Sequence, residues 1–220
     1  MFPRSTLWLA LFVTAPGLLH ADPKPPVEIP LDVHDWKVID RESGDVNYYK
    51  VIDVPDMPYI HSAYEPPWET AVLGYEIPAD ARSDARRLRW TWRAMQLPKA
   101  GNECLAGHGD SAATIYVTWK RGLRWYTLKY VWSTTLAKGT VCEHKRNAFV
   151  AQDVVVAETG FPVGVWKTEE IDLRSEWRKH FADGDTNASV PELRGLGIMS
   201  DGDQTNSGSS ADFARFVLVR

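Results

Sequence analysis

The sequence consists of short apolar runs separated by clusters of turn-forming residues over nearly its whole length. The runs are rich in aromatic and β-branched residues, and they give about ten predicted strands of roughly five to eight residues. Helical periodicity is scarce: the best segment is Ser175 to Phe181, where Ser175 is placed to cap the first turn and Trp177 and Phe181 share one face. Because strands and long helices do not alternate, a nucleotide-binding parallel sheet is excluded. The pattern predicts an all-β protein, a single β-sandwich of jelly-roll type with one or two short helices.

The N-terminal 21 residues have the order of a secretory signal peptide. Arg4 comes first, an apolar run from Leu7 to Leu19 follows, and Ala21 is a small residue suited to cleavage. A membrane span needs roughly 20 apolar residues, and this run is shorter and interrupted; no later stretch comes closer. We expect cleavage near Ala21 and a periplasmic or secreted protein, with a proline-rich leader at residues 22–35 and one sandwich domain at residues 36–220.

Export bears on the expected state of the two cysteines. In an oxidising compartment Cys104 and Cys142 are able to form a disulfide, which in the chain-entropy model would stabilise the fold by about 4 kcal/mol. Two separate buried thiols are the alternative. Neither cysteine has the Cys-x-x-Cys spacing of a metal site.

The charge of the chain argues against nucleic acid as a partner. Its formal net charge is -4, whereas binding to phosphates requires clustered Lys and Arg. The basic stretches, such as Arg82 to Arg89, have acidic residues nearby and are expected to be solvated faces.

Two aromatic strands are the strongest indication of a ligand. In Leu88 to Arg93 a period of two places Leu88, Trp90 and Trp92 on one face, which we expect to be core, and turns Arg89 and Arg93 outward. The run Trp125 to Trp132 has rings on both faces, so that one face would leave rings near solvent as a sugar platform, for which we select Tyr130 and Trp132. An aromatic core is the competing interpretation.

The C-terminal part of the chain contains an acidic loop. Apolar residues from Leu196 lead into the loop, and the alternating run Phe213 to Val219 leaves it, which predicts a β-hairpin closing a sheet. Asp201, Asp203 and Thr205 at alternate positions are typical of a calcium loop. Asn206 replaces the required Gly, however, and a turn held by Asp and Thr side chains is the alternative. No cofactor is expected apart from this calcium.

Glu170 and Asp172 are the best pair of catalytic carboxylates. Glycosidases use two such groups, and the segment Glu170 to Glu176 resembles the Glu-x-Asp-x-x-Glu signature of jelly-roll glucanases, but its last Glu falls one residue late. Surface charge before a short helix is the competing interpretation.

Several of these stretches together resemble a family of exported bacterial proteins catalogued as a domain of unknown function (three-zero-four-seven). The likeness runs from about Trp36 to Val219 and rests on Trp-x-Trp-Arg, an Asp before a strand, Tyr-Val-Trp and Met-x-Asp-x-Asp-x-Thr. The matching polar positions are Arg93, Asp110, Asp201, Asp203 and Thr205. The resemblance implies a strand pattern similar to galactose-binding jelly rolls and carbohydrate-binding modules, and no activity.

These observations favour a non-catalytic module that binds a polysaccharide or oligosaccharide through a sheet face or the loops at one edge. The predicted contacts are Arg93, Asp110, Tyr130 and Trp132. Two alternatives remain at this point: an enzyme acting on polysaccharide, either a hydrolase or a lyase, and an envelope domain that binds a protein.

Overall fold

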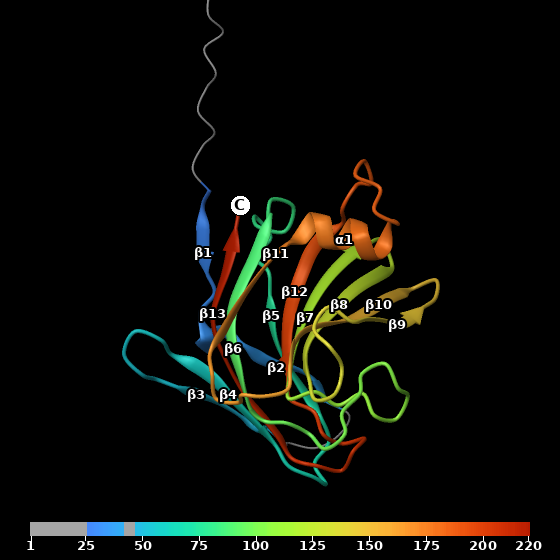
Figure 1. Cartoon of the computed structure of the whole chain (residues 1–220). Coiled ribbons are helices and arrows are strands. Elements are labelled where there is room, and N and C mark those ends of the chain that lie inside the picture. The colour runs from blue at the N-terminus through green and yellow to red at the C-terminus, as the bar shows by residue number, and fades with distance from the viewer. Residues whose placement is uncertain (1–25, 42–46) are drawn as a thin grey trace, which may run out of the picture.

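The computed structural model describes residues 26–41 and 47–220, and it shows two β-sheets packed face to face (Figure 1). The predicted signal peptide lies outside the described residues. Between residues 26 and 220 the strands are β1 (Glu28–Pro30), β2 (Lys37–Arg41), β3 (Tyr49–Ile52), β4 (Tyr59–Tyr64), β5 (Ala71–Glu76), β6 (Arg87–Gln96), β7 (Ala113–Arg121), β8 (Arg124–Ser133), β9 (Val141–Arg146), β10 (Val150–Thr159), β11 (Lys167–Asp172), β12 (Glu192–Met199) and β13 (Ser209–Val219).

The strands divide into a six-stranded and a seven-stranded sheet. The six-stranded sheet has the order β11-β6-β13-β4-β3, with β1 also paired to β13. The seven-stranded sheet has the order β2-β5-β12-β7-β8-β10-β9; β8 and β10 pair in parallel, and the other described pairs in this sheet are antiparallel. The predicted jelly-roll β-sandwich is confirmed.

The core between the sheets is aromatic. Trp90 and Trp92 of β6 are fully buried, as the alternation in that strand predicted. Their rings meet those of Tyr130 and Trp132 from β8, with centroids 5.6 and 5.8 Å apart. Rings from both sheets therefore interlock, and burial of such large side chains is the main source of stability in a fold of this kind.

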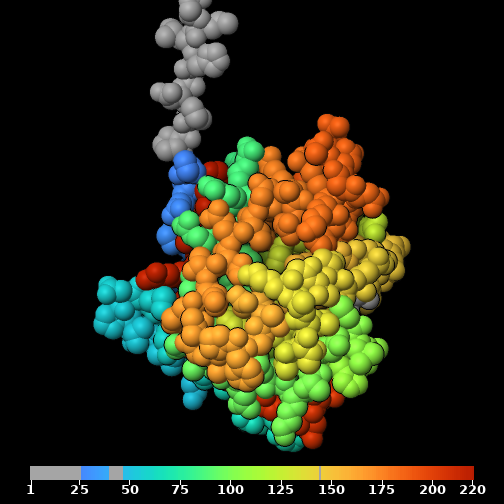
Figure 2. All heavy atoms as spheres, in the orientation of Figure 1, coloured from blue at the N-terminus to red at the C-terminus, as the bar shows by residue number. Residues whose placement is uncertain are grey.

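The helix α1 (Leu173–Phe181) covers one end of this core, and in Figure 2 α1 and the residues after it form the orange surface at the upper right. It begins before the predicted segment because Asp172, not Ser175, is the N-cap: the Asp172 carboxylate accepts hydrogen bonds from the backbone N–H groups of Arg174 and Ser175, at 3.1 and 2.7 Å. The Trp177 ring packs against Tyr126 at 5.4 Å.

The proline-rich leader is partly built into the sandwich. Although the domain was predicted to start at residue 36, β1 already pairs with the C-terminal half of β13, and a short 3-10 helix, Val33–Asp35, follows. β13 changes partner from β4 to β1 near Arg215, which has a φ of 50° and produces a bulge in the pairing with β6.

The predicted hairpin between β12 and β13 is wrong, because these two strands belong to different sheets. The loop between them bonds to the segment before β7 instead: Asp201 N–H donates to the Ser111 carbonyl at 3.0 Å, and Lys99 N–H donates to Ser207 Oγ at 2.9 Å. The acidic loop therefore crosses one end of the sandwich.

The predicted disulfide between Cys104 and Cys142 is present, with 5.3 Å between the Cα atoms. It links the loop before β7 to β9 at the edge of the seven-stranded sheet. Within residues 26–41 and 47–220, no helix is long and apolar enough to cross a membrane.

Candidate functional site

The outer face of the seven-stranded sheet carries a groove of about 460 Å³, here called the outer groove. Its floor is formed by Gly195 and Gly197 of β12, and its walls come from β2, β5, β7, β8 and β10. The wall residues are Ile39, Val72, Tyr75, Glu76, Tyr116, Thr118, Trp125, Thr127 and Gln152, and β12 also contributes Arg194 and Leu196 to the lining.

Strand alternation explains why the groove exists. In β7, Ile115, Val117 and Trp119 point into the core, so the residues between them face outward. β12 supplies two glycines where outward side chains would stand. A Cβ at Gly197 would lie 3.1 Å from Val72 Cγ1 and 3.3 Å from Tyr116 Cβ, so these two side chains approach the backbone closely and leave no room for a side chain there.

The groove combines aromatic rings with polar groups. The side chain of Trp125 is 38% exposed, and the Lys120 ammonium lies 4.3 Å from its ring centroid. Lys129 lies 5.2 Å from the ring centroid of Tyr116. Neither lysine lines the groove itself, whose polar side chains include those of Thr118, Thr127 and Gln152. Flat apolar rings beside hydroxyl and amide groups suit a sugar chain, since its C–H faces stack and its hydroxyls form hydrogen bonds.

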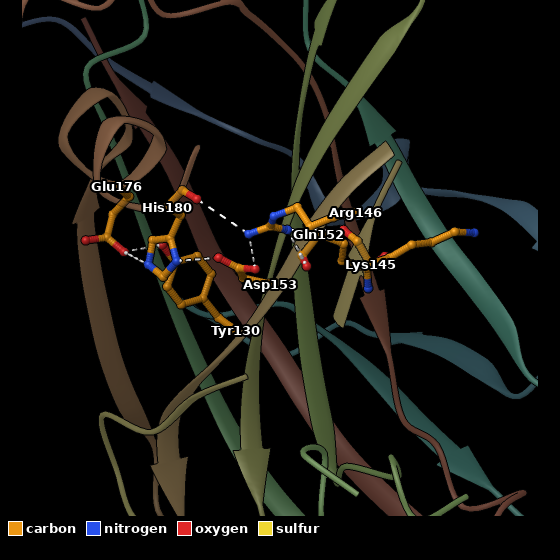
Figure 3. Close-up of polar contacts among 7 residues, drawn as sticks. All are labelled: Tyr130, Lys145, Arg146, Gln152, Asp153, Glu176 and His180. Carbon is orange, nitrogen blue, oxygen red and sulfur yellow. Dashed lines mark hydrogen bonds and ion pairs between the residues drawn. The ribbon is translucent and has the colours of Figure 1, made fainter. Parts of the chain in front are cut away.

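Two of the four predicted sugar contacts lie in the core instead. Tyr130 and Trp132 are only 3% and 1% exposed, because they share the inward phase of β8 with Leu128. The Tyr130 hydroxyl donates to Glu176 Oε2 at 2.8 Å, within a polar cluster that fixes α1 to the sheet (Figure 3). Burial raises the pKa of Tyr130 well above its ordinary value. The exposed ring of this strand is that of Trp125.

The same cluster contains groups typical of acid–base chemistry. His180 Nδ1 lies 2.9 Å from Asp153 Oδ2, and Arg146 pairs with the other oxygen of Asp153 (Figure 3). The side chains of His180 and Asp153 are only 4% and 6% exposed. A polymer cannot reach them, so the cluster acts as a clamp between β10 and α1.

Arg93 faces outward as predicted, but on the six-stranded sheet. Its guanidinium is 2.6 Å from Asp212 Oδ2, and it lies 4.4 Å from the ring centroid of Trp166. His61 Nδ1 lies 2.6 Å from the other oxygen of Asp212. Sequence reasoning missed His61 and Asp212 because β4, β6 and β13 become neighbours only in the folded sheet.

The acidic residues meet at one end of the sandwich. Oxygen atoms of Asp110, Asp201 and Asp203 lie within 4.8 Å of one another. Thr205, predicted as a third ligand beside Asp201 and Asp203, instead donates its hydroxyl proton to Asp110 at 2.6 Å. Asp110 is fully buried and also accepts the backbone N–H of Thr205, so it holds the loop rather than facing a sugar.

The electrostatics of this cluster are unfavourable for three carboxylates. Burial, with the charges of Asp203 and Asp110 adding to it, raises the pKa of Asp201 to about 7. Either a proton or a hard divalent cation bound to these oxygens relieves the repulsion. Asp110, Asp201 and Asp203 are the residues able to hold such a cation.

The predicted catalytic pair has other partners. Glu170 accepts hydrogen bonds from Arg87 and Arg89, at 3.1 and 3.3 Å, and Asp172 caps α1. The competing interpretation of this segment, surface charge before a short helix, describes these contacts.

The model of a family described as a protein of unknown function (DUF3047) matches residues 68–217. The chain belongs to this family. The resemblance found in the sequence motifs is thereby confirmed, and the matched region includes the groove strands β5, β7, β8, β10 and β12.

Among solved structures, the chain is similar to a family 11 carbohydrate-binding module from Clostridium thermocellum in complex with a β-1,3-1,4-mixed-linked tetrasaccharide. The identity is 13% and the TM-score 0.45, over 87% of this chain and 94% of that one. It is also similar to the xyloglucanase domain of NopAA, a type three effector from Sinorhizobium fredii, in complex with cellobiose, with 10% identity, a TM-score of 0.45 and coverage of 87% and 97%. None of the curated proteins matches the sequence.

Proposed function

We propose that the outer groove binds a polysaccharide or oligosaccharide chain without cleaving it. The observation that carries the proposal is the groove itself: a channel of about 460 Å³ is lined by Gly195 and Gly197 and by the rings of Tyr75, Tyr116 and Trp125. A single sheet face that combines exposed rings with Thr118, Thr127 and Gln152 offers both stacking and hydrogen bonding along an extended ligand.

The proposal assigns binding rather than hydrolysis because the predicted carboxylates lie elsewhere. Glu170 and Asp172 belong to β11 of the six-stranded sheet, while Glu76, which pairs with Arg82 at 2.6 Å, is the only carboxylate among the described residues that line the outer groove. A glycosidase needs two carboxyl groups flanking the bond that it breaks.

We also propose that the protein works outside the cytoplasm. The support is the disulfide between Cys104 and Cys142, because such bonds persist in oxidising compartments. Periplasmic extraction of the native producer, followed by thiol labelling before and after reduction, tests this: cytoplasmic, fully reduced protein would contradict it.

Affinity electrophoresis through gels that contain neutral or acidic polysaccharides tests binding. We expect retardation in at least one gel, and at least tenfold weaker binding, about 1.4 kcal/mol, in Trp125→Ala and in Tyr116→Ala. Trp68→Ala is the matched control: its side chain is similarly exposed, at 42%, but does not line the groove.

A second variant tests the shape of the groove rather than its rings. Gly195→Leu keeps every ring and polar group of the groove but projects a side chain into the channel, so we expect retardation to disappear. A Cβ at Gly195 would lie 3.2 Å from the Tyr75 carbonyl oxygen, so the melting temperature of the variant is measured first to establish that it is folded. The released reducing ends are measured in parallel. Uniform mobility of the wild-type protein in all gels would overturn the proposal, and new reducing ends would overturn the absence of cleavage.

A further inference from the structure

The end of the sandwich that α1 covers carries a cavity distinct from the outer groove. Its volume is about 270 Å³, and it lies between α1, the segment before β6 and the segment before β12. Three arginines line it, Arg82, Arg174 and Arg178, and we call it the arginine pocket. The remaining lining residues are uncharged: Ser83, Ala85, Trp119, Leu173, Ser189, Val190, Pro191 and Leu193.

Backbone carbonyls hold each arginine in place without neutralising it. Arg174 donates to the Ser83 carbonyl at 3.0 Å, Arg178 to the Ala188 carbonyl at 3.0 Å, and Arg82 to the Ile77 carbonyl at 2.9 Å. A guanidinium has five N–H donors in a rigid fork, so one such bond fixes its orientation and leaves donors for a ligand.

The positive charge of the pocket is largely uncompensated. Arg82 pairs with Glu76 at 2.6 Å, but the structure, over the residues it describes, gives Arg174 and Arg178 no carboxylate partner. These two arginines are one helical turn apart, a spacing at which like charges repel. In a chain whose net charge is -4, this concentration of cations is unusual.

A neighbouring hollow adds further positive charge beside the arginine pocket. It is about 410 Å³ in volume, shares Arg174 and Arg178 with the arginine pocket, and adds Arg86 and Lys179. Among the described residues that line this hollow, Asp172 is the only carboxylate, and it already accepts two N–H groups at the start of α1. An anion in the arginine pocket would therefore face cations on two sides.

We propose that the arginine pocket binds a phosphate or sulfate group. Arginine forks match the oxygen geometry of these groups and form charge-assisted hydrogen bonds that are roughly twice as strong as neutral ones. The hydroxyls of Ser83 and Ser189 are further donors in the lining. The volume is several times the roughly 30 Å³ of one water molecule, so the pocket has room for the oxyanion together with part of the molecule that carries it.

Calorimetric titration of the mature protein with inorganic phosphate, and separately with sulfate, tests the proposal. Sodium chloride at equal ionic strength is the control for screening. We expect saturable binding of phosphate or sulfate, weakened at least tenfold in Arg174→Gln and in Arg178→Gln. Arg87→Gln is the matched control, since it removes the same charge from an arginine that lies outside the pocket and pairs with Glu170.

The two arginine variants keep the test interpretable if one of them misfolds, because each arginine has its own carbonyl partner; their melting temperatures are measured first. Trp125→Ala should leave phosphate binding unchanged, so failure of the polysaccharide proposal and failure of this one are separable. Vesicles of phosphatidylglycerol, with phosphatidylcholine vesicles as reference, show whether the phosphate belongs to a lipid: cosedimentation that both variants abolish assigns that source.

No saturable binding of phosphate, sulfate or phosphatidylglycerol vesicles would overturn the proposal. Binding that Arg87→Gln weakens as much as Arg178→Gln would also overturn it, because the effect would then follow net charge and not the pocket.

Discussion

Aromatic residues have different roles on the two faces of the seven-stranded sheet, and β8 contributes rings to both faces. On the inner face, Tyr130 and Trp132 are almost fully buried, and their polar atoms bond to Glu176 and to the Gly160 carbonyl, at 2.8 and 3.1 Å. On the outer face, Trp125 is 38% exposed beside a channel floored by glycine. An aromatic-rich strand therefore does not identify a binding site; the residues opposite each ring do.

Truncating one ring on each face tests this contrast most strongly. Trp132→Ala should lower the free energy of unfolding by about 3 to 5 kcal/mol, because it leaves a large cavity in the core. Trp125→Ala should lower it by less than about 1 kcal/mol. Urea titration of both variants gives the comparison, and equal losses would mean that Trp125 is a core residue.

The disulfide links the loop before β7 to β9, at the edge of the seven-stranded sheet. Replacing both cysteines by serine should cost about 4 kcal/mol, the chain-entropy value for a separation of 38 residues. A reducing agent should lower the melting temperature of the wild-type protein to that of the double variant. Polysaccharide binding should survive in the folded variant because neither cysteine lines the groove; an unchanged melt on reduction would mean free thiols.

The buried carboxylate of Asp201 lies beside two other carboxylates, those of Asp110 and Asp203. Its pKa of about 7 exceeds the ordinary value of 3.8, so the folded state holds a proton that the unfolded chain releases. Its contribution to stability is therefore full below about pH 4 and is lost as the pH rises through 7. Asp201→Asn should flatten this dependence and be the more stable protein at pH 8.

A bound cation would reverse the expected effect of Asp201→Asn on stability at pH 8. If the three carboxylates hold Ca²⁺, chelator should lower the melting temperature of the wild-type protein at pH 8, and Asp201→Asn should melt lower and ignore chelator. The melting temperature is measured by scanning calorimetry. A melting temperature that chelator leaves unchanged would contradict calcium binding by these carboxylates.

The smallest effect is expected where a predicted catalytic residue is structural. Asp172→Ala should cost about 1 kcal/mol through loss of the helix cap, whereas Asp172→Asn should retain most of that stability. Neither substitution should alter retardation in the polysaccharide gels. A loss of binding in both would show that the ligand reaches β11, and the assignment of binding to the outer groove would fail.

The local alternation of apolar and polar residues in the sequence was enough to predict many of the strands and several side-chain directions. Period-two alternation determined the strands, the burial of Trp90 and Trp92 and the outward direction of Arg93, because successive side chains of a strand must point to opposite faces. The pairing of Cys104 with Cys142 was also open to inference, since only one pair was available.

Only the tertiary structure decided which face of β8 is the interior, because rings occupy both phases of that strand. It also decided that β12 and β13 enter different sheets, which brought Asp110 to Asp201 and Asp203. The outer groove depends on Gly195 and Gly197 lying between the side chains of β5 and β7, and the arginine pocket on α1 meeting the segment that contains Arg82. Both sites join residues distant in sequence, and pairing across a sheet is not encoded in the period of any single strand.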